Sequence, residues 1–249
     1  MISIKSGNEI ELMRAAGKLV AQCHELIAEA IRPGITTNSL DKMAKDYFRK
    51  NGAYPTFLGY QGFPKSICAS INDEVVHGIP SNRKLNEGDI ISIDLGCTLN
   101  GFVGDAARTH AVGHITDEAQ RLIDVTRESF FKGIEFARQG NRLSDISHAV
   151  QVYVEANGFS VVRDYVGHGI GREMHEDPPI PNYGRAGRGP RLCQGMCLAI
   201  EPMVNEGHYD VDVLDNDWTV VTIDGSLSAH YENTILITGE SEPENLTLL

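Results

Sequence analysis

The residues best suited to chemistry are two aspartates in one short stretch. Asp94 and Asp105 lie in ISIDLGCTLNGFVGDAART, residues 91–109, on either side of an Asn-Gly pair. The run before this pair alternates and is β-branched, and an extended pattern resumes after it. Because Asn-Gly is the preferred two-residue type I′ turn, the stretch predicts a β-hairpin.

The predicted turn also fixes which residues of the hairpin face each other. A turn at positions 100 and 101 places Asp94 opposite Ala107. It places Asp105 opposite Gly96, two pairs closer to the turn. Residues two apart on a strand share a face, so both carboxylates project from the same side, about 7–8 Å apart at Cα.

Two carboxylates this close repel each other, and one is forced neutral unless a cation lies between them. The alternative interpretation is a solvated turn face that carries two acids. The apolar residues around Asp94 weaken that alternative, but the hairpin by itself leaves both interpretations open.

Three further candidates lie in the second half of the chain. His168 stands between two glycines in VGHGIGREMHEDPP, Glu201 ends the apolar run LAIEP, and Glu232 enters the β-branched run AHYENTILIT. Taken singly, His168 is as well explained as a loop residue, and Glu201 as a strand-end acid. Together with Asp94 and Asp105 they make four carboxylates and one imidazole, whose charge two divalent cations would neutralise. Such ligands favour manganese, iron(II), cobalt or zinc, and two ions about 3.5–4 Å apart suit hydrolysis.

The pattern of the whole chain predicts four helices and two extended regions. Apolar spacing, capping residues and glycine stops place the helices at residues 8–32, 37–51, from a cap at Thr116 to about 139, and 143–157. Extended and turn-rich sequence covers residues 53–114 and most of 159–238.

The order helix, helix, strands therefore occurs twice, and the sequence repeats with it. At an offset of 106, RPGITTNSLDKMAKDYFRKNG lies over RQGNRLSDISHAVQVYVEANG, and at 107, LNEGDIISID lies over LCQGMCLAIE. The second alignment places Asp94 over Glu201. We interpret this as an old duplication within one catalytic domain, residues 1–249, with halves of about 1–114 and 115–249. Packing about a pseudo-twofold axis would bring acids from both halves together.

Composition limits the classes of protein to which the chain can belong. Its 249 residues are 41% hydrophobic and 22% charged, as in ordinary globular domains. A net charge of −12 argues against general affinity for nucleic acid or anionic membranes. Five cysteines without Cys-x-x-Cys spacing fit a reducing compartment. With no apolar signal segment or membrane span, we expect a cytoplasmic protein.

Taken together, the motifs resemble the type I methionine aminopeptidases over essentially the whole chain. The similarity includes DLGCTLNGFVGDAART, GHGIGREMHEDPP, AIEPM and YENT, with GYQGFPKSIC and INDEVVHGIP upstream. The resemblance implies the α+β pita-bread fold. In that fold two pseudo-twofold-related helix-helix-strand halves surround a central antiparallel sheet.

The resemblance also assigns roles to particular residues. It implies that two divalent metal ions (Mn, Fe, Co or Zn) are held by Asp94, Asp105, His168, Glu201 and Glu232. Asp94 and Glu232 would contribute to both ions. Glu201 resembles the general base that moves a proton from the bridging water to the leaving amine. His77 resembles the histidine that contacts the substrate near its amino end, and His175 the one that hydrogen-bonds the scissile carbonyl.

A further group resembles the family's methionine side-chain pocket. An apolar slot with sulfur and aromatic groups suits an unbranched thioether, and the corresponding positions here hold Tyr60, Phe63, Cys68, Met174 and Trp218. Simple core packing is a serious alternative for Tyr60, Phe63 and Trp218. Two positions depart from the family pattern, since many relatives have phenylalanine at Met174 and glutamine at His230.

These implications define the expected function. We expect a metallo-exopeptidase that removes the initiator methionine from nascent proteins and peptides with a small second residue. The alternative is a proline dipeptidase-like hydrolase of the same fold, whose chains usually carry a large additional N-terminal domain. A non-enzymatic ribosome- or RNA-binding module is a third interpretation, but such relatives lose metal ligands. We expect a monomer without direct nucleic-acid or membrane function, and transient ribosome contact stays open.

Overall fold

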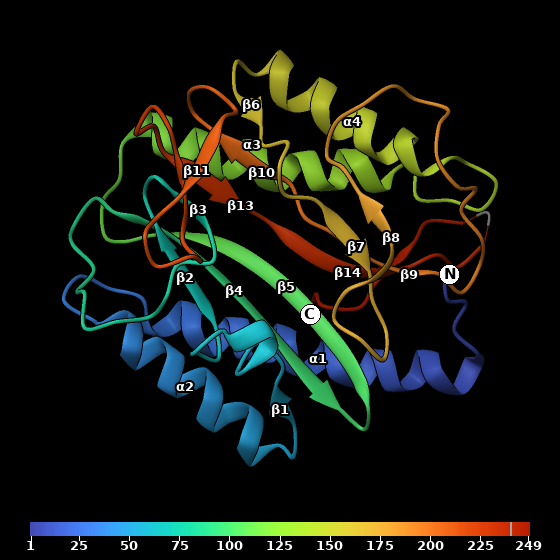
Figure 1. The fold of residues 1–249 in the computed structure, drawn as a ribbon, viewed down its shortest axis with the longest axis horizontal. Coiled ribbons are helices and arrows are strands. Elements are labelled where there is room, and N and C mark those ends of the chain that lie inside the picture. Colours follow the sequence, from blue (N-terminus) through green and yellow to red (C-terminus); the bar gives the residue numbers. More distant parts are fainter. Residues whose placement is uncertain (240) are drawn as a thin grey trace.

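A large antiparallel sheet forms the centre of the computed structural model, which describes residues 1–239 and 241–249. Its nine strands are β1 (Tyr54–Pro55), β2 (Cys68–Ile71), β4 (Ile90–Leu99), β5 (Phe102–Ala111), β7 (Gly167–Gly169), β8 (Glu176–Ile180), β9 (Cys197–Ile200), β14 (Glu232–Leu236) and β15 (Glu244–Asn245). Along the sheet the order is β1-β4-β5-β14-β9-β7-β8, while β2 pairs with β4 and β15 with β14. Figure 1 shows this sheet face-on.

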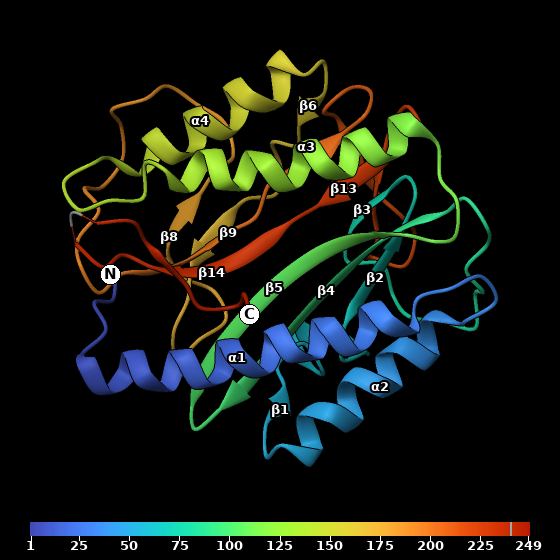
Figure 2. The same ribbon diagram turned by 180° about the vertical axis from the view of Figure 1, so that it is seen from behind.

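Four helices cover one face of the sheet in two pairs. They are α1 (Gly7–Ala30), α2 (Thr37–Lys50), α3 (Asp117–Ile134) and α4 (Leu143–Ala156). Figure 2 shows α1 and α3 in front of the sheet, with α2 beside α1 and α4 beside α3. Apolar side chains under α1 and α2 meet the sheet at Ile91, Ile93 and Leu95. None of the helices in the described part of the chain is long and apolar enough to cross a membrane.

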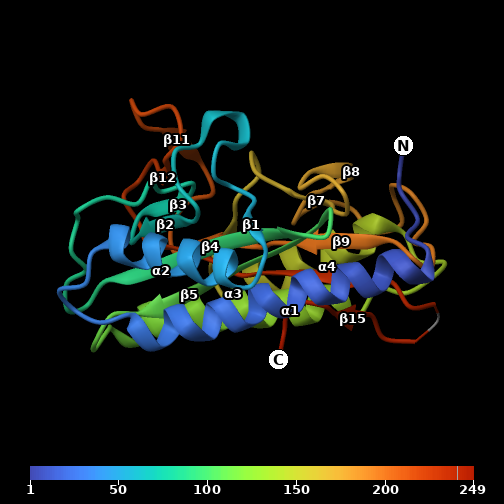
Figure 3. The same ribbon diagram turned by 90° about the horizontal axis from the view of Figure 1, so that it is seen from below.

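Shorter strands form two further sheets beside the central one. Two three-stranded sheets contain β6 (Ser160–Val161), β10 (Met203–Asn205) and β13 (Ser228–His230), and β3 (Glu74–Val76), β11 (Val211–Val213) and β12 (Val220–Thr222); a short 3-10 turn, η1, covers Tyr60–Gly62. Figure 3 shows β11, β12 and β3 on the side of the sheet opposite α1 and α3. The sheet of β6, β10 and β13 instead packs against α3 and α4.

The predicted helices are confirmed, with one correction at the end of α3. The predicted helix runs to about residue 139, but α3 ends at Ile134. Beyond it the backbone hydrogen bonds connect residues three apart, as in a 3-10 turn. Phe136 N–H donates to the Gly133 carbonyl, and Ala137 N–H donates to the Ile134 carbonyl. The tightened chain turns the fully buried Ala137 into the core. Helical periodicity does not indicate where α3 ends, because the burial of Ala137 depends on contacts with distant segments of the chain.

The predicted hairpin is confirmed in both its turn and its register. Asn100 and Gly101 connect β4 to β5 with φ values of 51° and 80°, the positive values that a type I′ turn requires. Asp94 pairs with Ala107, and Asp105 pairs with Gly96. Both aspartates therefore project from the same face of the sheet, the face that the helices leave open.

Candidate metal centre and substrate pocket

The sheet register lines up acidic side chains from three neighbouring strands. Ala107 on β5 has Asp94 beside it on β4 and Glu232 beside it on β14. Asp105 lies two residues before Ala107 on β5, and alternate residues of a strand share a face. All three carboxylates consequently point to the same side of the sheet.

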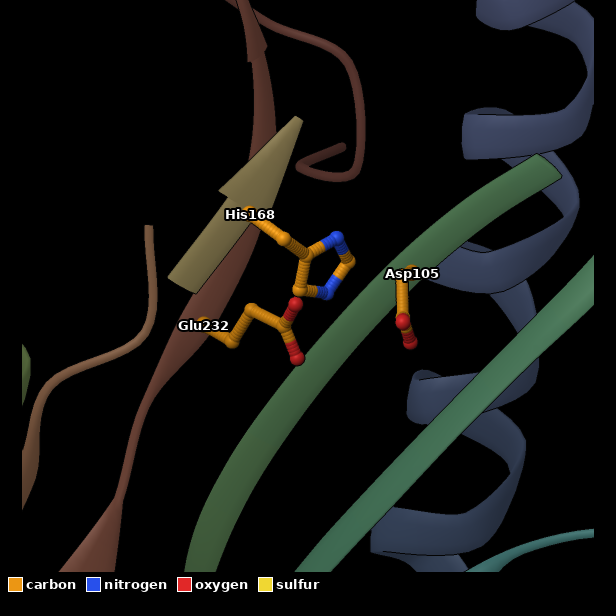
Figure 4. Close-up of side chains that lie close together, drawn as sticks. All are labelled: Asp105, His168 and Glu232. Carbon is orange, nitrogen blue, oxygen red and sulfur yellow. The ribbon is translucent and has the colours of Figure 1, made fainter. Parts of the chain in front are cut away.

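The second half of the sheet adds the imidazole and a fourth carboxylate. His168 on β7 pairs with Ala199 on β9, and Glu201 follows two residues after Ala199. The His168 Nε2 atom lies 3.5 Å from a Glu201 carboxylate oxygen. Figure 4 shows Asp105, His168 and Glu232 directed toward one common point, and one ligand atom from each lies within 4.8 Å of the others.

Burial makes this cluster unstable as bare acids. Asp105 and Glu232 are 4% and 2% exposed. One carboxylate oxygen each of Asp94, Asp105 and Glu232 is buried and has no hydrogen-bond partner among the described residues. Burial, followed by repulsion from the neighbouring carboxylates, raises the pKa of Asp94 and Glu232 well above the usual range, and burial raises the pKa of Asp105 to about 7. Burial likewise raises the pKa of Glu201 well above its usual range.

The His168 imidazole is neutral and has a free ring nitrogen on the side of the carboxylates. His168 Nδ1 lies 2.9 Å from the Gly169 carbonyl and donates its hydrogen there, which leaves the Nε2 lone pair directed at the carboxylates. Burial lowers the pKa of His168 to about 3, so the ring stays neutral. Unpartnered buried oxygens together with a neutral imidazole are donors that fit a divalent metal centre.

A cavity of about 160 Å³ opens beside this cluster. All twelve residues singled out from the sequence line it, together with Phe57 and Gln61. Phe57 and Gln61 were not predicted to line it, although both lie close to Tyr60 in the run TFLGYQGF. An apolar cavity of about 150 Å³ accepts a group of benzene's size. The space therefore suits one medium-sized apolar side chain.

One part of the cavity wall is apolar and contains sulfur. Phe63, Cys68 and Met174 are 3–6% exposed, and Phe63 packs edge-on against Trp218 with ring centroids 5.0 Å apart. Cys68 pairs with Asp94 across β2 and β4, so the wall adjoins the acidic cluster directly. Burial raises the pKa of the Cys68 thiol well above its usual range, which keeps it protonated.

Two histidines stand at the edge of the cavity. The His175 Nδ1 atom lies 2.7 Å from the Tyr60 hydroxyl, which is placed to donate a hydrogen bond to it. Nδ1 then accepts, and the hydrogen of the neutral ring is on Nε2. His77 follows β3 with a left-handed φ of 60°, a conformation that costs energy in a residue other than glycine. Burial lowers the pKa of His77 to about 4.

Two residues behind the cluster complete its surroundings. His230 Nε2 lies 3.6 Å from a Glu201 oxygen, and burial lowers the pKa of His230 to about 3, so this ring is neutral at ordinary pH. The Arg108 guanidinium donates to the Glu232 carbonyl and to the Asn233 side chain. Arg108 lies on β5 of the hairpin, but nothing in the sequence pattern indicates that it turns toward the strand carrying Glu232.

The chain matches known proteins along nearly its full length. A sequence profile of metallopeptidase family M24 matches residues 11–239. A protein of Clostridium acetobutylicum named methionine aminopeptidase is 62% identical over 249 residues, which are 100% of this chain and 99% of the relative. The crystal structure of methionine aminopeptidase from Rickettsia prowazekii is 46% identical, covers 100% of both chains and superposes with a TM-score of 0.98.

More distant similarity extends only to the fold. The solved prolidase from Pyrococcus furiosus has a TM-score of 0.79 at 22% identity. The alignment covers 99% of this chain but 65% of the prolidase. The fold is thus the pita-bread fold with its central antiparallel sheet, as the sequence predicts.

Proposed function

The chain belongs to metallopeptidase family M24 and to its methionine aminopeptidases, and from this we propose a more specific function. It removes the initiator methionine from nascent proteins and peptides whose second residue is small, with two divalent metal ions. The observation that carries this proposal is the convergence of four carboxylates and one neutral imidazole in a cavity whose remaining wall holds apolar, aromatic and sulfur side chains. We further propose that it works as a cytoplasmic monomer.

The proposed metal ligands are the five groups of the cluster. Asp94, Asp105, His168, Glu201 and Glu232 would hold the ions. Divalent ions held by these residues would offset the charge of the carboxylates and would supply Lewis-acid activation of water and of the scissile carbonyl. The unpartnered carboxylate oxygens of Asp94, Asp105 and Glu232 support this assignment.

The chain's own residues would then handle the proton and the substrate. Glu201 accepts a proton from the attacking water and delivers it to the leaving amine. His175 donates from Nε2 to the carbonyl oxygen as that oxygen gains charge, since the Tyr60 hydroxyl occupies its Nδ1. His77 contacts the substrate near its amino end.

Substrate selection would rest on the apolar wall. Tyr60, Phe63, Cys68, Met174 and Trp218 surround the space that the methionine side chain would fill. An unbranched thioether buries well among aromatic and sulfur groups. The flexible Met174 side chain forms part of this wall, so we expect unbranched analogues of methionine to be accepted as well.

The first experiment is release of methionine from Met-Ala-Ser by chelator-stripped protein. Mn²⁺, Fe²⁺, Co²⁺ and Zn²⁺ are added back separately, and bound metal is counted by titration. We expect activity to vanish on stripping and to return with metal, at two ions per chain. Met-Leu-Ser serves as the matched substrate and should be cleaved much more slowly. Retained activity after complete stripping would contradict the metal proposal.

The same assay tests the proline dipeptidase alternative when an X-Pro dipeptide is used as a second substrate. Its support is the fold, which the prolidase shares at 22% identity. An X-Pro dipeptide should therefore release little product under conditions that cleave Met-Ala-Ser. The reverse preference would make the dipeptidase interpretation the better one.

A further inference from the structure

The first five residues connect the N-terminus to the loop that carries two cavity residues. We call residues 171–177 the pocket loop, because it contains Met174 and His175. The Met1 amine lies 2.5 Å from Asp177 Oδ2, and Lys5 Nζ lies 2.6 Å from Glu176 Oε2. Figures 1 and 3 show the N-terminus near β8, the strand that begins at Glu176.

Lys5 is a buried cation rather than a surface residue. Its side chain is 4% exposed, and that of Glu176 is 15% exposed. The Lys5 ammonium also donates to Ser3 Oγ at 3.0 Å, and the Lys5 backbone N–H donates to the Gly195 carbonyl at 2.8 Å. Removing one partner from such a pair leaves the other charge buried and unpaired.

The paired carboxylate also organises the backbone of the pocket loop. Glu176 Oε1 accepts hydrogen bonds from the backbone N–H groups of Arg172 and Glu173, at 2.8 and 3.3 Å. One oxygen of Glu176 thus meets Lys5 while the other holds the two amides that directly precede Met174. A Cβ atom on Gly171 would lie 2.5 Å from both this oxygen and Lys5 Cε. The ion pair consequently packs straight against the loop backbone.

The far side of the pocket loop faces the substrate cavity. Met174 is 6% exposed and lines the cavity, and His175 is held by the Tyr60 hydroxyl. Lys5 does not line the cavity, so its influence there passes through Glu176 and the loop backbone. A shift of about 1 Å in a group that contacts the reacting atoms can lower a rate about 100-fold.

We propose that Lys5 is a positioning residue for the reaction. Through Glu176 it fixes the pocket loop so that His175 and Met174 are held where they meet the substrate. This inference rests on the proposed function of His175 and Met174. The competing explanation is that the N-terminal ion pair stabilises the fold and has no specific effect on the reaction.

The test compares Lys5→Met with Arg14→Met. Arg14 also forms an ion pair with a distant segment, since its guanidinium lies 2.6 Å from Glu244 Oε2. Within the described residues, its side-chain hydrogen bonds go to Glu11 and Glu244 and not to the pocket loop. With Met-Ala-Ser we expect Lys5→Met to lower kcat about ten- to a hundred-fold, with a smaller change in KM. Arg14→Met should keep kcat within about two-fold of the wild type.

A double-mutant cycle separates positioning from general stabilisation. If Lys5 acts through His175, Lys5→Met should cost little further activity in a protein that already carries His175→Ala. Full additivity of the two losses would overturn the proposal. Cleavage of Met-Ala-Ser by the wild type tests the proposed function by itself, so the two failures are distinguishable.

Two readouts follow the pocket loop directly. Hydrogen exchange of the Arg172 and Glu173 amides should accelerate at least ten-fold in Lys5→Met and not in Arg14→Met. The double variant Lys5→Met/Glu176→Gln removes the unpaired charge yet keeps an acceptor for these amides, so it should regain part of kcat. If Lys5→Met does not fold, Lys5→Gln, which removes the charge beside Glu176 and keeps a polar side chain there, gives the same exchange measurement. Unchanged exchange in a folded variant would overturn the proposal.

Discussion

The proposed proton transfer depends on one side chain, the carboxylate of Glu201. It lies within 3.6 Å of both His168 and His230 without forming a hydrogen bond to either ring. Both rings are neutral, since burial lowers their pKa values to about 3. A carboxylate between neutral rings keeps its own capacity to accept a proton, as a general base requires.

Replacing Glu201 should therefore abolish most of the activity without unfolding the protein. We expect Glu201→Gln to lower kcat with Met-Ala-Ser by about 10²- to 10⁴-fold, because glutamine cannot accept the proton. The measurement is steady-state methionine release at saturating metal, with bound metal counted in parallel. Glu128→Gln, an exposed substitution on α3, is the matched control. Undiminished cleavage by Glu201→Gln would remove Glu201 from the mechanism.

At the scale of elements, α1 links the sheet to the end of the chain. Gly17 faces the C-terminal segment so closely that a Cβ atom there would lie 2.2 Å from the Leu246 carbonyl oxygen. The next residue, Thr247, bonds through its hydroxyl to Asn233, the neighbour of Glu232. A displaced C-terminal segment would thus disturb the strand that carries a proposed ligand.

Alanine substitutions at two glycines of α1 should have different effects on stability. Gly17→Ala should lower the free energy of unfolding by about 1–3 kcal/mol, because the backbone contact leaves no room for a methyl group. Gly7→Ala, where nothing lies within 4 Å, should be neutral or slightly stabilising. Thermal and urea unfolding of the two variants measure the difference. Equal stability of both would show that α1 and the C-terminal segment can move apart at little cost.

At the scale of the whole molecule, the two halves repeat the same local bonds. Gly34 N–H donates to the Leu85 carbonyl in the first half, and Gly140 N–H donates to the Leu192 carbonyl in the second. These pairs stand at the offsets of 106 and 107 that the sequence repeat has. The matching bonds support our proposal that one domain arose by duplication, with proposed ligands from each half meeting between them.

Folding of the metal-free protein should depend on pH through the acidic cluster. A carboxyl whose pKa is higher in the folded state binds protons more tightly there, so its contribution to stability is lost as pH rises. Asp105 sets the pH range of this loss, because burial raises its pKa from 3.8 to about 7. Each unit of such a shift corresponds to roughly 1.4 kcal/mol.

We therefore expect the Tm of stripped protein to fall between about pH 4 and pH 7. Bound metal needs deprotonated carboxylates, so the metal-loaded protein should not show this decline. The gain in Tm on adding Mn²⁺ should accordingly grow with pH over the same range. Differential scanning calorimetry at several pH values, with and without metal, measures both. A gain in Tm that is independent of pH would contradict the account of the cluster.

Local rules made much of the fold predictable from the sequence. An Asn-Gly turn requires positive φ values, so the hairpin register and the common face of Asp94 and Asp105 followed directly. Helical periodicity likewise located all four helices to within a few residues, except at the end of α3. Residue types and positions indicated five candidate metal ligands, and the resemblance to a family added the other seven residues that line the same cavity.

Only the tertiary structure decided what depends on contacts between distant segments. Arg108 bonds to the carbonyl of Glu232, α3 ends early so that Ala137 enters the core, and Lys5 pairs with Glu176. Lys5 and Glu176 are 171 positions apart, and no period or turn rule operates over that distance. A charge that is buried on folding is costly unless an opposite charge lies beside it, and such a partner can come from any part of the chain. The sequence alone therefore determined the types and local order of the chemical groups, and packing determined their partners.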